Sequence, residues 1–444
     1  MELDWAALAT FLTWVDAQAA AELAAGTTRR QERLWRTARY ATMRLCTVYP
    51  DADPDRIPAS VEPALWSIIT AACTDPDPRP ADGRDDADDG YADPASLDAV
   101  RPEALRAAIL YGLRAQRRSG GSDVPEVMEV LDEHVSLAND SALAVRAMFG
   151  QRLQALLRLN PDWTATHLDS ILPTGAEHRT VWRAAWHGHL SNNVLTDAAW
   201  VLLRPHYHRA VDLLDPATTG EWALLRAKQL AMHLGNRYWF GQLSLEDPDR
   251  LLRRFYERVP AAAAGTIIEV AGRSFRPDEP VDPQHGERLA QLWQYRIDAV
   301  RAGGDPAELD GFDAWFVNGP FDEAWSLEQL DDALAIVSDL DLGVHVLRRL
   351  RTLAAGHPHA CLRVLKHLAG NRVRRWEVAR HAALIRDIIG TAATEPGVAG
   401  EARQLVSAFA VDGFDFRDAL HGTIRFGSPP PEDPSTDDPP ATQP

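Results

Sequence analysis

Histidines occur in three close pairs, and the histidine imidazole is a common ligand of zinc. The pairs are His187 with His189, His206 with His208, and His357 with His359. A zinc site needs imidazoles that converge on one point, a third ligand and, for catalysis, an open position. Two side chains separated by one residue on a helix point to different faces, so no pair forms a site by itself. We therefore predict surface or core-edge histidines and no metal ligands. A metal-dependent enzyme built on residues 178–208 is an alternative.

Motifs of other catalytic and cofactor sites are absent from the sequence. The two lysines, Lys228 and Lys366, do not follow glycine, so there is no Gly-Lys-Ser/Thr to hold the phosphates of a nucleotide. No Gly-x-Gly occurs, which excludes the dinucleotide-binding fingerprint. The sequence also lacks the His-Glu-x-x-His of zinc proteases and the Gly-x-Ser-x-Gly of serine hydrolases. We accordingly expect no catalytic residue, no cofactor and no enzymatic activity.

Charge is distributed unevenly towards the C-terminus. Residues 303–341 hold eleven acids and neither lysine nor arginine, whereas residues 345–381 hold nine basic residues and one acid, Glu377. The basic residues of this ridge are Arg348, Arg349, Arg351, Arg363, Lys366, Arg372, Arg374, Arg375 and Arg380. They are the candidate binding residues of the chain, because such a ridge can recognise an acidic partner, a phosphate or a nucleic acid.

A second interpretation of this pattern is charge compensation between neighbouring helical hairpins. Adjacent repeats of a solenoid touch, so an acidic face and a basic face can neutralise each other. A nucleic-acid ridge normally interleaves exposed aromatic residues, and Trp376 is the one tryptophan within residues 345–381. We favour compensation over nucleic-acid or anion binding, which stays an alternative.

Three tryptophans, Trp182, Trp186 and Trp200, lie within the histidine-rich region. Trp182 and Trp186 are four residues apart and share one face of a helix. Such rings can stack on a ligand or a base. Their helical spacing among alanines and leucines instead predicts a core between helices.

Helical periodicity dominates the elements that must position these residues. Residues 143–157 place apolar side chains on one helix face, and residues 326–338 and 342–353 do the same. Ser326 is a candidate N-cap. Residues 266–272 are the best candidate for a strand, but alanine-rich flanks favour a helix there. The sequence predicts an all-α fold of roughly twenty helices.

Short breaks separate the periodic segments. At Asn160-Pro161, Asp215-Pro216 and Asp247-Pro248, the polar residue is suited to cap a helix that has proline at its first position. Short connections make sequence neighbours antiparallel neighbours in space. Hairpins recur at roughly 35–45 residues without identical motifs, which favours degenerate repeats. We predict a HEAT/armadillo-like α-solenoid of antiparallel helical hairpins over residues 1–426.

Two segments depart from the helical pattern. Residues 74–94 are acidic and rich in proline and glycine, which predicts an exposed loop. They do not form a calcium loop, because Ala87 and Ser96 stand where an EF-hand needs oxygen ligands and a glutamate. Residues 427–444 have almost no apolar side chains, which predicts a disordered tail.

Several segments carry tryptophan, leucine and arginine patterns of helix packing. They include DPASLDAVRPEALRAAILYGL at 93–113, VWRAAWHGHLSNNVLTDAAWVLLRPHYHRAV at 181–211 and EARQLVSAFAVDGFDFRDAL at 401–420. With residues 125–173 and 289–334, they resemble, in order, the C-terminal helical-repeat region of large bacterial ATP-binding proteins of the STAND type. Many of those proteins are linked to antiphage defence. At Arg101-Pro102 the chain departs from the pattern, which expects glycine after the arginine.

The resemblance implies an interaction module and no reaction of its own. Members carry an NTPase or effector domain ahead of this region, whereas here Met1 is followed almost directly by a helical segment. The function implied is a sensor or target-binding arm of a bacterial defence or signalling system, or a scaffold. Its expected partner is a protein, such as an ATPase or effector supplied in trans.

Composition limits the location and the partners of the chain. The formal net charge of −18 argues against a surface that binds nucleic acid or anionic membranes throughout. The N-terminus begins with acidic residues and has no basic segment of a signal peptide, and no apolar run is long enough to span a membrane. Three scattered cysteines fit a reducing compartment and predict buried thiols. We expect a cytoplasmic protein that makes no membrane contact.

Overall fold

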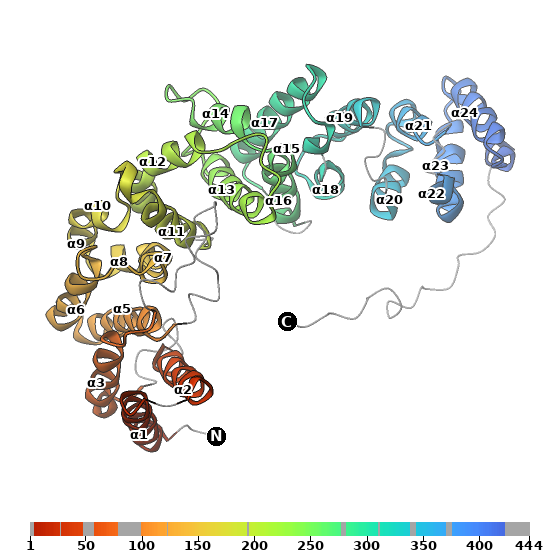
Figure 1. Ribbon diagram of the computed structural model, residues 1–444. Helices are drawn as coiled ribbons and strands as arrows, with labels where there is room; N and C mark the ends of the chain where they lie inside the picture. The colour runs from red at the N-terminus through yellow and green to blue at the C-terminus, as the bar shows by residue number, and fades with distance from the viewer. Residues whose placement is uncertain are drawn as a thin grey trace. The chain divides into compact units, whose positions relative to one another are not determined.

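The computed structural model describes residues 4–26, 28–47, 57–78, 99–121, 123–192, 195–276, 281–309, 311–337, 343–369 and 375–421. Within these ranges every regular element is a helix and no strand is present (Figure 1). The predicted all-α fold is confirmed, and residues 266–272 are helical as expected. No helix in the described ranges is long and apolar enough to cross a membrane.

The chain divides into two compact units, residues 1–264 and 265–444. The predicted solenoid, residues 1–426, would include the whole first unit and most of the second. That both units belong to one solenoid stays a prediction. Most of the predicted acidic loop, from residue 79 to residue 94, and the whole predicted tail lie outside the described residues.

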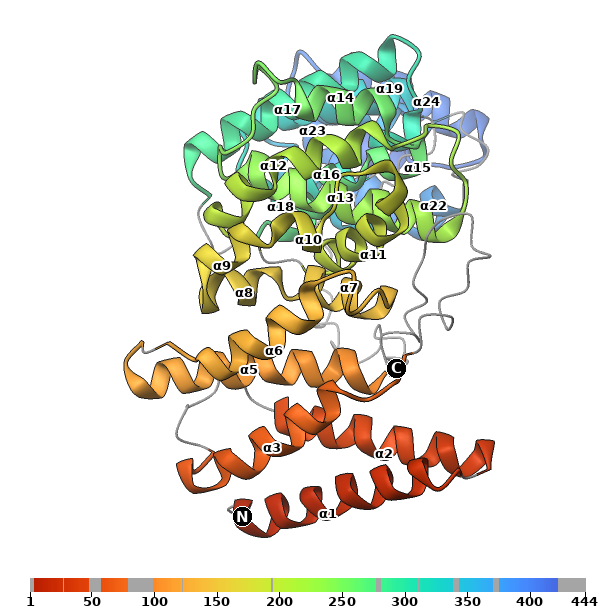
Figure 2. The same ribbon diagram turned by 60° about the vertical axis from the view of Figure 1, so that its left-hand side comes forward.

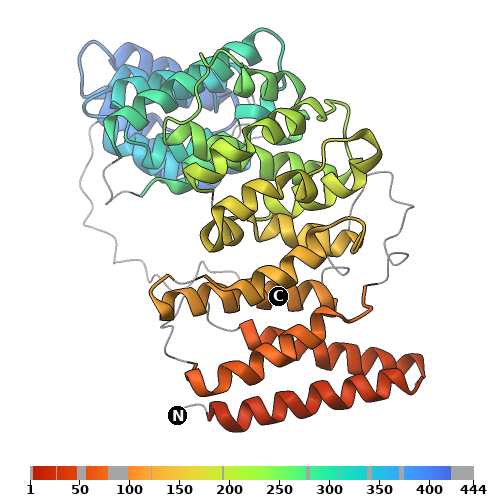
Figure 3. The same ribbon diagram turned by 90° about the vertical axis from the view of Figure 1, so that its left-hand side faces the viewer.

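The first unit is built of helices joined by short connections. In chain order, with η for 3-10 helices, they are α1 (Trp5–Ala24), α2 (Arg29–Thr47), η2 (Ala59–Val61), α3 (Glu62–Cys73), α5 (Val100–Ser119), α6 (Pro125–Val135), α7 (Leu143–Gln151), α8 (Leu153–Leu159), α9 (Pro161–Thr166), α10 (Leu168–Ile171), η4 (Ala176–His178), α11 (Arg179–Leu190), α12 (Asp197–Asp212), α13 (Glu221–Trp239), α14 (Leu251–Arg258) and α15 (Ala261–Ala264). Figure 3 shows that the helices of residues 5–159 follow one another in layers, in chain order.

Packing in this unit runs from each layer to the next. Helix α1 packs on α2 and α3, these two pack on α5, and α5 packs on α6, α7 and α8. The closest pairing joins α7 to α11. A Cβ atom added to Gly150 would overlap the backbone of Ala185, and one added to Gly188 would overlap the backbone of Ala147. Glycine at both positions therefore lets the two helix backbones touch.

The second unit continues with α16 (Thr266–Ser274), α17 (Pro283–Arg301), η5 (Pro306–Leu309), α18 (Phe312–Asn318), α19 (Glu323–Ile336), α20 (Val344–Leu353), α21 (Pro358–Lys366), α22 (Arg375–Arg380), α23 (Ala382–Ala393), α24 (Ala399–Val411) and η7 (Arg417–His421). Its core holds Trp293, Phe312 and Trp315, all fully buried. The rings of Trp293 and Phe312 stack with centroids 3.8 Å apart. Helix α21 packs on α19, α23 and α24.

Some of the predicted helix boundaries are right and others are wrong. Asn160 caps α9 by accepting a hydrogen bond from the backbone N–H of Trp163 at 2.9 Å, with Pro161 at the first helical position, as predicted. Asp215-Pro216 and Asp247-Pro248 instead lie in turns, and the helices after them begin later, at Glu221 and Leu251.

Two further expectations about single helices are wrong. Ser326 lies inside α19, whose N-cap is Asp322, because the Asp322 carboxylate accepts hydrogen bonds from the backbone N–H groups of Ala324 and Trp325. Residues 143–157 do not form one helix, because the backbone turns at Arg152 between α7 and α8.

Arg101-Pro102 lies in the first turn of α5, where proline is tolerated because the first N–H groups need no partner within the helix.

Candidate functional site

The basic ridge predicted from sequence lies on three helices of the second unit. Arg348, Arg349 and Arg351 are on α20, Arg363 and Lys366 are on α21, and Arg375 and Arg380 are on α22. Arg372 and Arg374 lie outside the described residues. Apart from Arg349, which is half-buried, the described members are exposed.

Several of these residues form ion pairs with acids on neighbouring helices. Arg349 lies 3.6 Å from Glu323 of α19, and Arg351 lies 3.6 Å from Asp387 of α23. Arg363 pairs with Asp331 of α19 at 2.9 Å. Arg375 donates a hydrogen bond to the backbone oxygen of Asp412 at 3.0 Å. Exposed pairs of this kind contribute at most about 1 kcal/mol each.

The pairing of α21 with α19 includes a histidine. His367 shares Asp331 with Arg363, at 2.8 Å from the second carboxylate oxygen. The pKa of Asp331 lies below its ordinary value because hydrogen bonds from His367 and Arg363 stabilise the carboxylate. Burial acts in the opposite direction, but the hydrogen bonds outweigh it. Acids of the segment 303–341 thus face bases of the ridge, which agrees with charge compensation. Binding by the ridge stays a prediction.

The histidines of residues 178–208 occupy different environments. His189 and His206 are buried, whereas His208 pairs with Asp249 at 3.1 Å. His187 lines a cavity. In the second unit, His357 lies 3.3 Å from Glu323 and His359 lies 3.1 Å from Glu401. Among the described residues, no three His, Cys, Asp or Glu side chains are grouped so as to hold a metal ion.

The two buried histidines belong to an aromatic core. The hydroxyl of Tyr207 lies 3.0 Å from Nε2 of His189 and 2.6 Å from Nδ1 of His233. Trp182 donates a hydrogen bond from its indole nitrogen to Nδ1 of His206 at 3.1 Å. Burial lowers the pKa of His206 and of His233 to about 4 and the pKa of His189 well below its ordinary value. These imidazoles are therefore neutral at neutral pH.

The tryptophans of this region form the core that was predicted. Trp182, Trp186 and Trp200 are all buried. The rings of Trp182 and Trp186 stack with centroids 5.5 Å apart, and the ring of Tyr207 is nearly perpendicular to that of Trp186, with centroids 4.9 Å apart. The guanidinium of Arg209 lies over the ring of Trp182 at 4.6 Å from its centroid. The Trp182 ring is thus in contact with both Trp186 and Arg209.

A cavity of about 340 Å³ opens beside this core, between α11, α12 and α13. Arg179 and Arg183 of α11 and Arg226 of α13 line it, and Asp215 is the one acid among the described lining residues. Burial and then the positive charges of Arg226 and Arg183 lower the pKa of His187 to about 3. The guanidinium of Arg226 lies 3.5 Å from the backbone oxygen of His187, and the three arginines give the cavity an excess of positive charge.

Aromatic rings form the apolar part of the same cavity. Trp182 and Trp186 line the cavity on the side of the buried core. Trp222 of α13 lines it on the solvent side, and 46% of the surface of this residue is exposed. We did not predict this site, because the ridge of residues 345–381 is the denser run of charge. The spacing of Arg179, Arg183, Trp186 and His187 places all four on one helix face, and that signal was available in the sequence.

A second candidate surface is the outward face of α1. The inward face buries Trp5, Ala9 and Leu12. On the opposite face Phe11 and Trp14 are 56% and 57% exposed, and their rings stack with centroids 6.2 Å apart. Figure 2 shows α1 as the outermost of the described helices of its unit.

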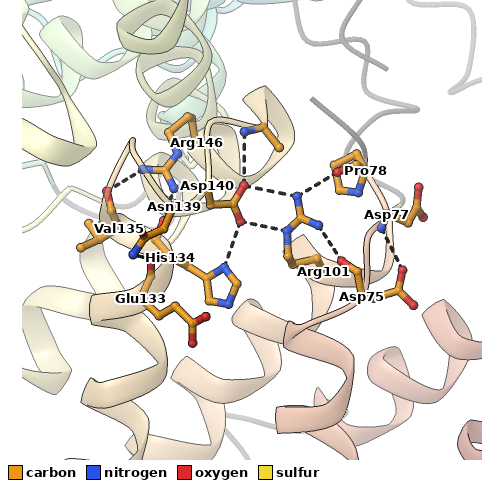
Figure 4. A network of polar contacts seen from close by, with 11 residues as sticks. Asp75, Asp77, Pro78, Arg101, Glu133, His134, Val135, Asn139, Asp140 and Arg146 are labelled. Atoms are coloured by element: carbon orange, nitrogen blue, oxygen red, sulfur yellow. Dashed lines mark hydrogen bonds and ion pairs between the residues drawn. The ribbon is translucent and has the colours of Figure 1, made fainter. Parts of the chain in front are cut away.

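A buried polar network fixes the connections around α5 and α6 (Figure 4). The guanidinium of Arg101 donates to Asp140 at 2.8 Å and to the backbone oxygens of Asp75 and Pro78. His134 lies 2.9 Å from the same Asp140 carboxylate. Burial raises the pKa of Asp140, but hydrogen bonds from His134 and Arg101 outweigh it, so the pKa lies below its ordinary value. Together with the backbone N–H of Ala142, these contacts tie the connection between α6 and α7 to α5.

The cysteines are buried, as predicted. Burial raises the pKa of Cys46, Cys73 and Cys361 to about 12, so all three stay protonated at neutral pH.

Comparisons with known proteins add no relative. No protein-family model, no curated protein and no solved structure matches the chain.

Proposed function

We propose that the chain is a non-catalytic, HEAT-like α-solenoid that binds a protein partner through the outward face of α1. The observation that carries this proposal is the exposed pair Phe11 and Trp14. Large exposed aromatic side chains are enriched among the residues that contribute most to protein interfaces. The layered helices of the first unit support a solenoid, because each layer packs mainly on the layers next to it in sequence.

The spacing on α1 indicates what kind of partner fits. Ala7, Phe11, Trp14 and Ala21 are all exposed and lie on a single helix face, which also carries the half-buried Gln18. A helix that is largely apolar on two opposite faces is normally covered on both. Helices α2 and α3 cover the inward face, and we propose that an apolar helix of the partner covers the outward one.

The resemblance to the helical-repeat region of STAND-type proteins supports a role for this interface. We propose a sensor or target-binding subunit, or a scaffold, in a bacterial defence or signalling system. Its partner would be an ATPase or an effector supplied in trans, so that any nucleotide chemistry of the complex belongs to the partner.

Affinity purification from the source bacterium, with and without phage challenge, tests the interface. The tagged chain is compared with a variant carrying Phe11→Ser and Trp14→Ser. We expect a stoichiometric protein in the first sample and its loss in the second. The matched control carries Phe240→Ser and Trp376→Ser, which also removes two aromatic side chains that are more than half exposed. Recovery of the same partner with all three chains would refute a role for α1.

Small-angle X-ray scattering tests the architecture. A compact globule of 444 residues has a radius of gyration of about 22 Å, and an extended array of repeats has a clearly larger one. A measured value near that of the globule would contradict the solenoid, whatever the result of the purification.

A further inference from the structure

We propose that the cavity between α11, α12 and α13 binds a small organic anion that carries an aromatic ring, with the size and chemistry of a nucleoside monophosphate. The cavity combines guanidinium groups with tryptophan rings in one volume of about 340 Å³. This site is separate from the face of α1, and the proposal does not depend on a protein partner.

Charge is the first part of the argument. Arg179, Arg183 and Arg226 bring three guanidinium groups to the lining, against a single described acid, Asp215. The Asp215 carboxylate accepts a hydrogen bond from the backbone N–H of Ala217 at 2.9 Å. Guanidinium groups bind phosphate oxygens through paired hydrogen bonds, and a phosphate monoester carries up to two negative charges. A dianionic group therefore matches this lining better than a neutral ligand does.

A buried polar atom points to the same conclusion. Among the described residues, Nδ1 of His187 has no hydrogen-bond partner although the atom is inaccessible to solvent. A buried polar nitrogen without a partner costs free energy, which a ligand that supplies a donor or acceptor recovers. His187 lies on α11 one turn from Arg183, so one ligand can reach both side chains.

The aromatic part of the lining indicates a planar group on the ligand. Trp222 is 46% exposed and lies one helical turn from Arg226 on α13. A base that stacks on an indole ring while its phosphate meets arginine is a common arrangement in nucleotide recognition. Trp182 and Trp186, which are both buried, form the inner side of the cavity.

Size limits the ligand to one ring system and one charged group. Small-molecule sites typically enclose about 300–1,000 Å³, and this cavity lies at the lower end of that range. A dinucleotide or a folded nucleic acid would not be enclosed.

Calorimetric titration of the full chain with each of the four ribonucleoside 5′-monophosphates tests the proposal. We expect saturable binding at one site per chain for at least one of them. Inorganic phosphate alone and the matching nucleoside alone should each bind at least tenfold more weakly, because each lacks half of the recognised chemistry. Affinity should fall as salt is raised, since charge contributes to it.

Two variants and two matched controls assign the binding to this cavity. Arg183→Ala and Trp222→Ala should each weaken binding at least tenfold. Arg183 is half-buried and Trp222 is exposed, so neither substitution removes a core side chain. Thermal melting checks that each variant is folded. Arg403→Ala and Phe240→Ala remove an exposed arginine and an exposed aromatic ring that belong neither to the cavity lining nor to the basic ridge, and should leave the affinity unchanged.

Three results would overturn the inference. The first is no saturable binding of any of the four nucleotides. The second is inorganic phosphate binding as tightly as the nucleotide, which would remove the role of the ring. The third is full affinity in both Arg183→Ala and Trp222→Ala, which would place the ligand elsewhere.

Discussion

Arginines are used differently in α11–α13 and in α20–α22. In the second unit they reach across to acids on adjacent helices, as Arg363 does to Asp331 and Arg351 does to Asp387. In the first unit Arg179, Arg183 and Arg226 gather around a cavity that has one acid among its described lining residues. The stretch with the denser run of positive charge is thus the more balanced one in space. Charge density along a sequence does not by itself locate a binding site.

The largest expected difference between the two regions is their response to acid. His206 and His233 have a pKa of about 4 in the folded chain and about 6.5 when unfolded. The unfolded state therefore takes up protons first as the pH falls below 6.5. Stability that is complete above pH 6.5 is lost progressively between about 6.5 and 4, by several kcal/mol. In α19–α21 the pKa of Asp331 is lowered by folding, so the stability that this carboxylate contributes is lost only below about pH 4.

Hydrogen exchange read by mass spectrometry resolves the two regions in one experiment. Peptides from α11–α13 should lose protection between pH 6.5 and pH 5, after correction for the intrinsic exchange rate, while peptides from α19–α21 keep theirs. Simultaneous loss of protection in both regions would contradict the difference in pKa.

The next effect concerns the position of α11, the helix that carries two of the cavity arginines. Gly188→Ala places a methyl group where the backbone of Ala147 lies, so α11 and α7 must separate. We expect a fall of about 3 kcal/mol in the free energy of unfolding, together with loss of ligand binding in the cavity. Denaturant titration and calorimetry measure the two quantities.

The control for this variant is Gly400→Ala in α24. An added Cβ atom meets nothing within 4 Å there, so the stability should stay equal or rise slightly. Equal stability of the Gly188→Ala and Gly400→Ala chains would show that α7 and α11 are not in backbone contact.

A smaller effect is expected from the polar core beneath the cavity. Tyr207→Phe removes the hydroxyl between His189 and His233 and leaves two buried ring nitrogens without that partner. The free energy of unfolding should fall by about 2 kcal/mol. Tyr295→Phe is the comparison, because Tyr295 is half-buried and lies outside this core. Thermal melts that do not distinguish the two variants would argue against the hydrogen-bonded core.

The smallest effect concerns the basic ridge. Arg363→Ala removes an exposed ion pair while His367 stays on Asp331, so the stability should change by no more than about 1 kcal/mol. Charge reversal at Lys366 and Arg380, two exposed ridge residues, should leave binding of single-stranded or duplex nucleic acid unchanged. A loss of salt-dependent binding in that variant would instead make the ridge a nucleic-acid surface.

Local sequence rules predicted the helices well and their junctions less well. Apolar spacing identified the helices because one face of each is buried, and Asn160 was recognised as a cap because it is a capping residue directly before a proline. The capping of α19 by Asp322 is equally local, because its carboxylate accepts from the backbone of Ala324 and Trp325, and choosing Ser326 instead placed the helix start four residues too late. The break at Arg152 interrupts a continuous apolar spacing, so the spacing did not reveal it.

The cavity was beyond the same rules. Burial of Trp182, Trp186 and Trp200 followed from their spacing. Arg183 on α11 and Arg226 on α13, forty-three positions apart, line the same cavity only because those helices pack side by side. Like charges placed together in this way cannot be inferred from one helix alone.

The contact of α7 with α11 through Gly150 and Gly188 also has a mechanical consequence. Helices separated by long side chains can slide by exchanging rotamers, but two backbones in direct contact have no such compliance. We therefore expect α7 and α11 to move together, so that a displacement of α11 at the cavity also shifts α7, which packs on α5.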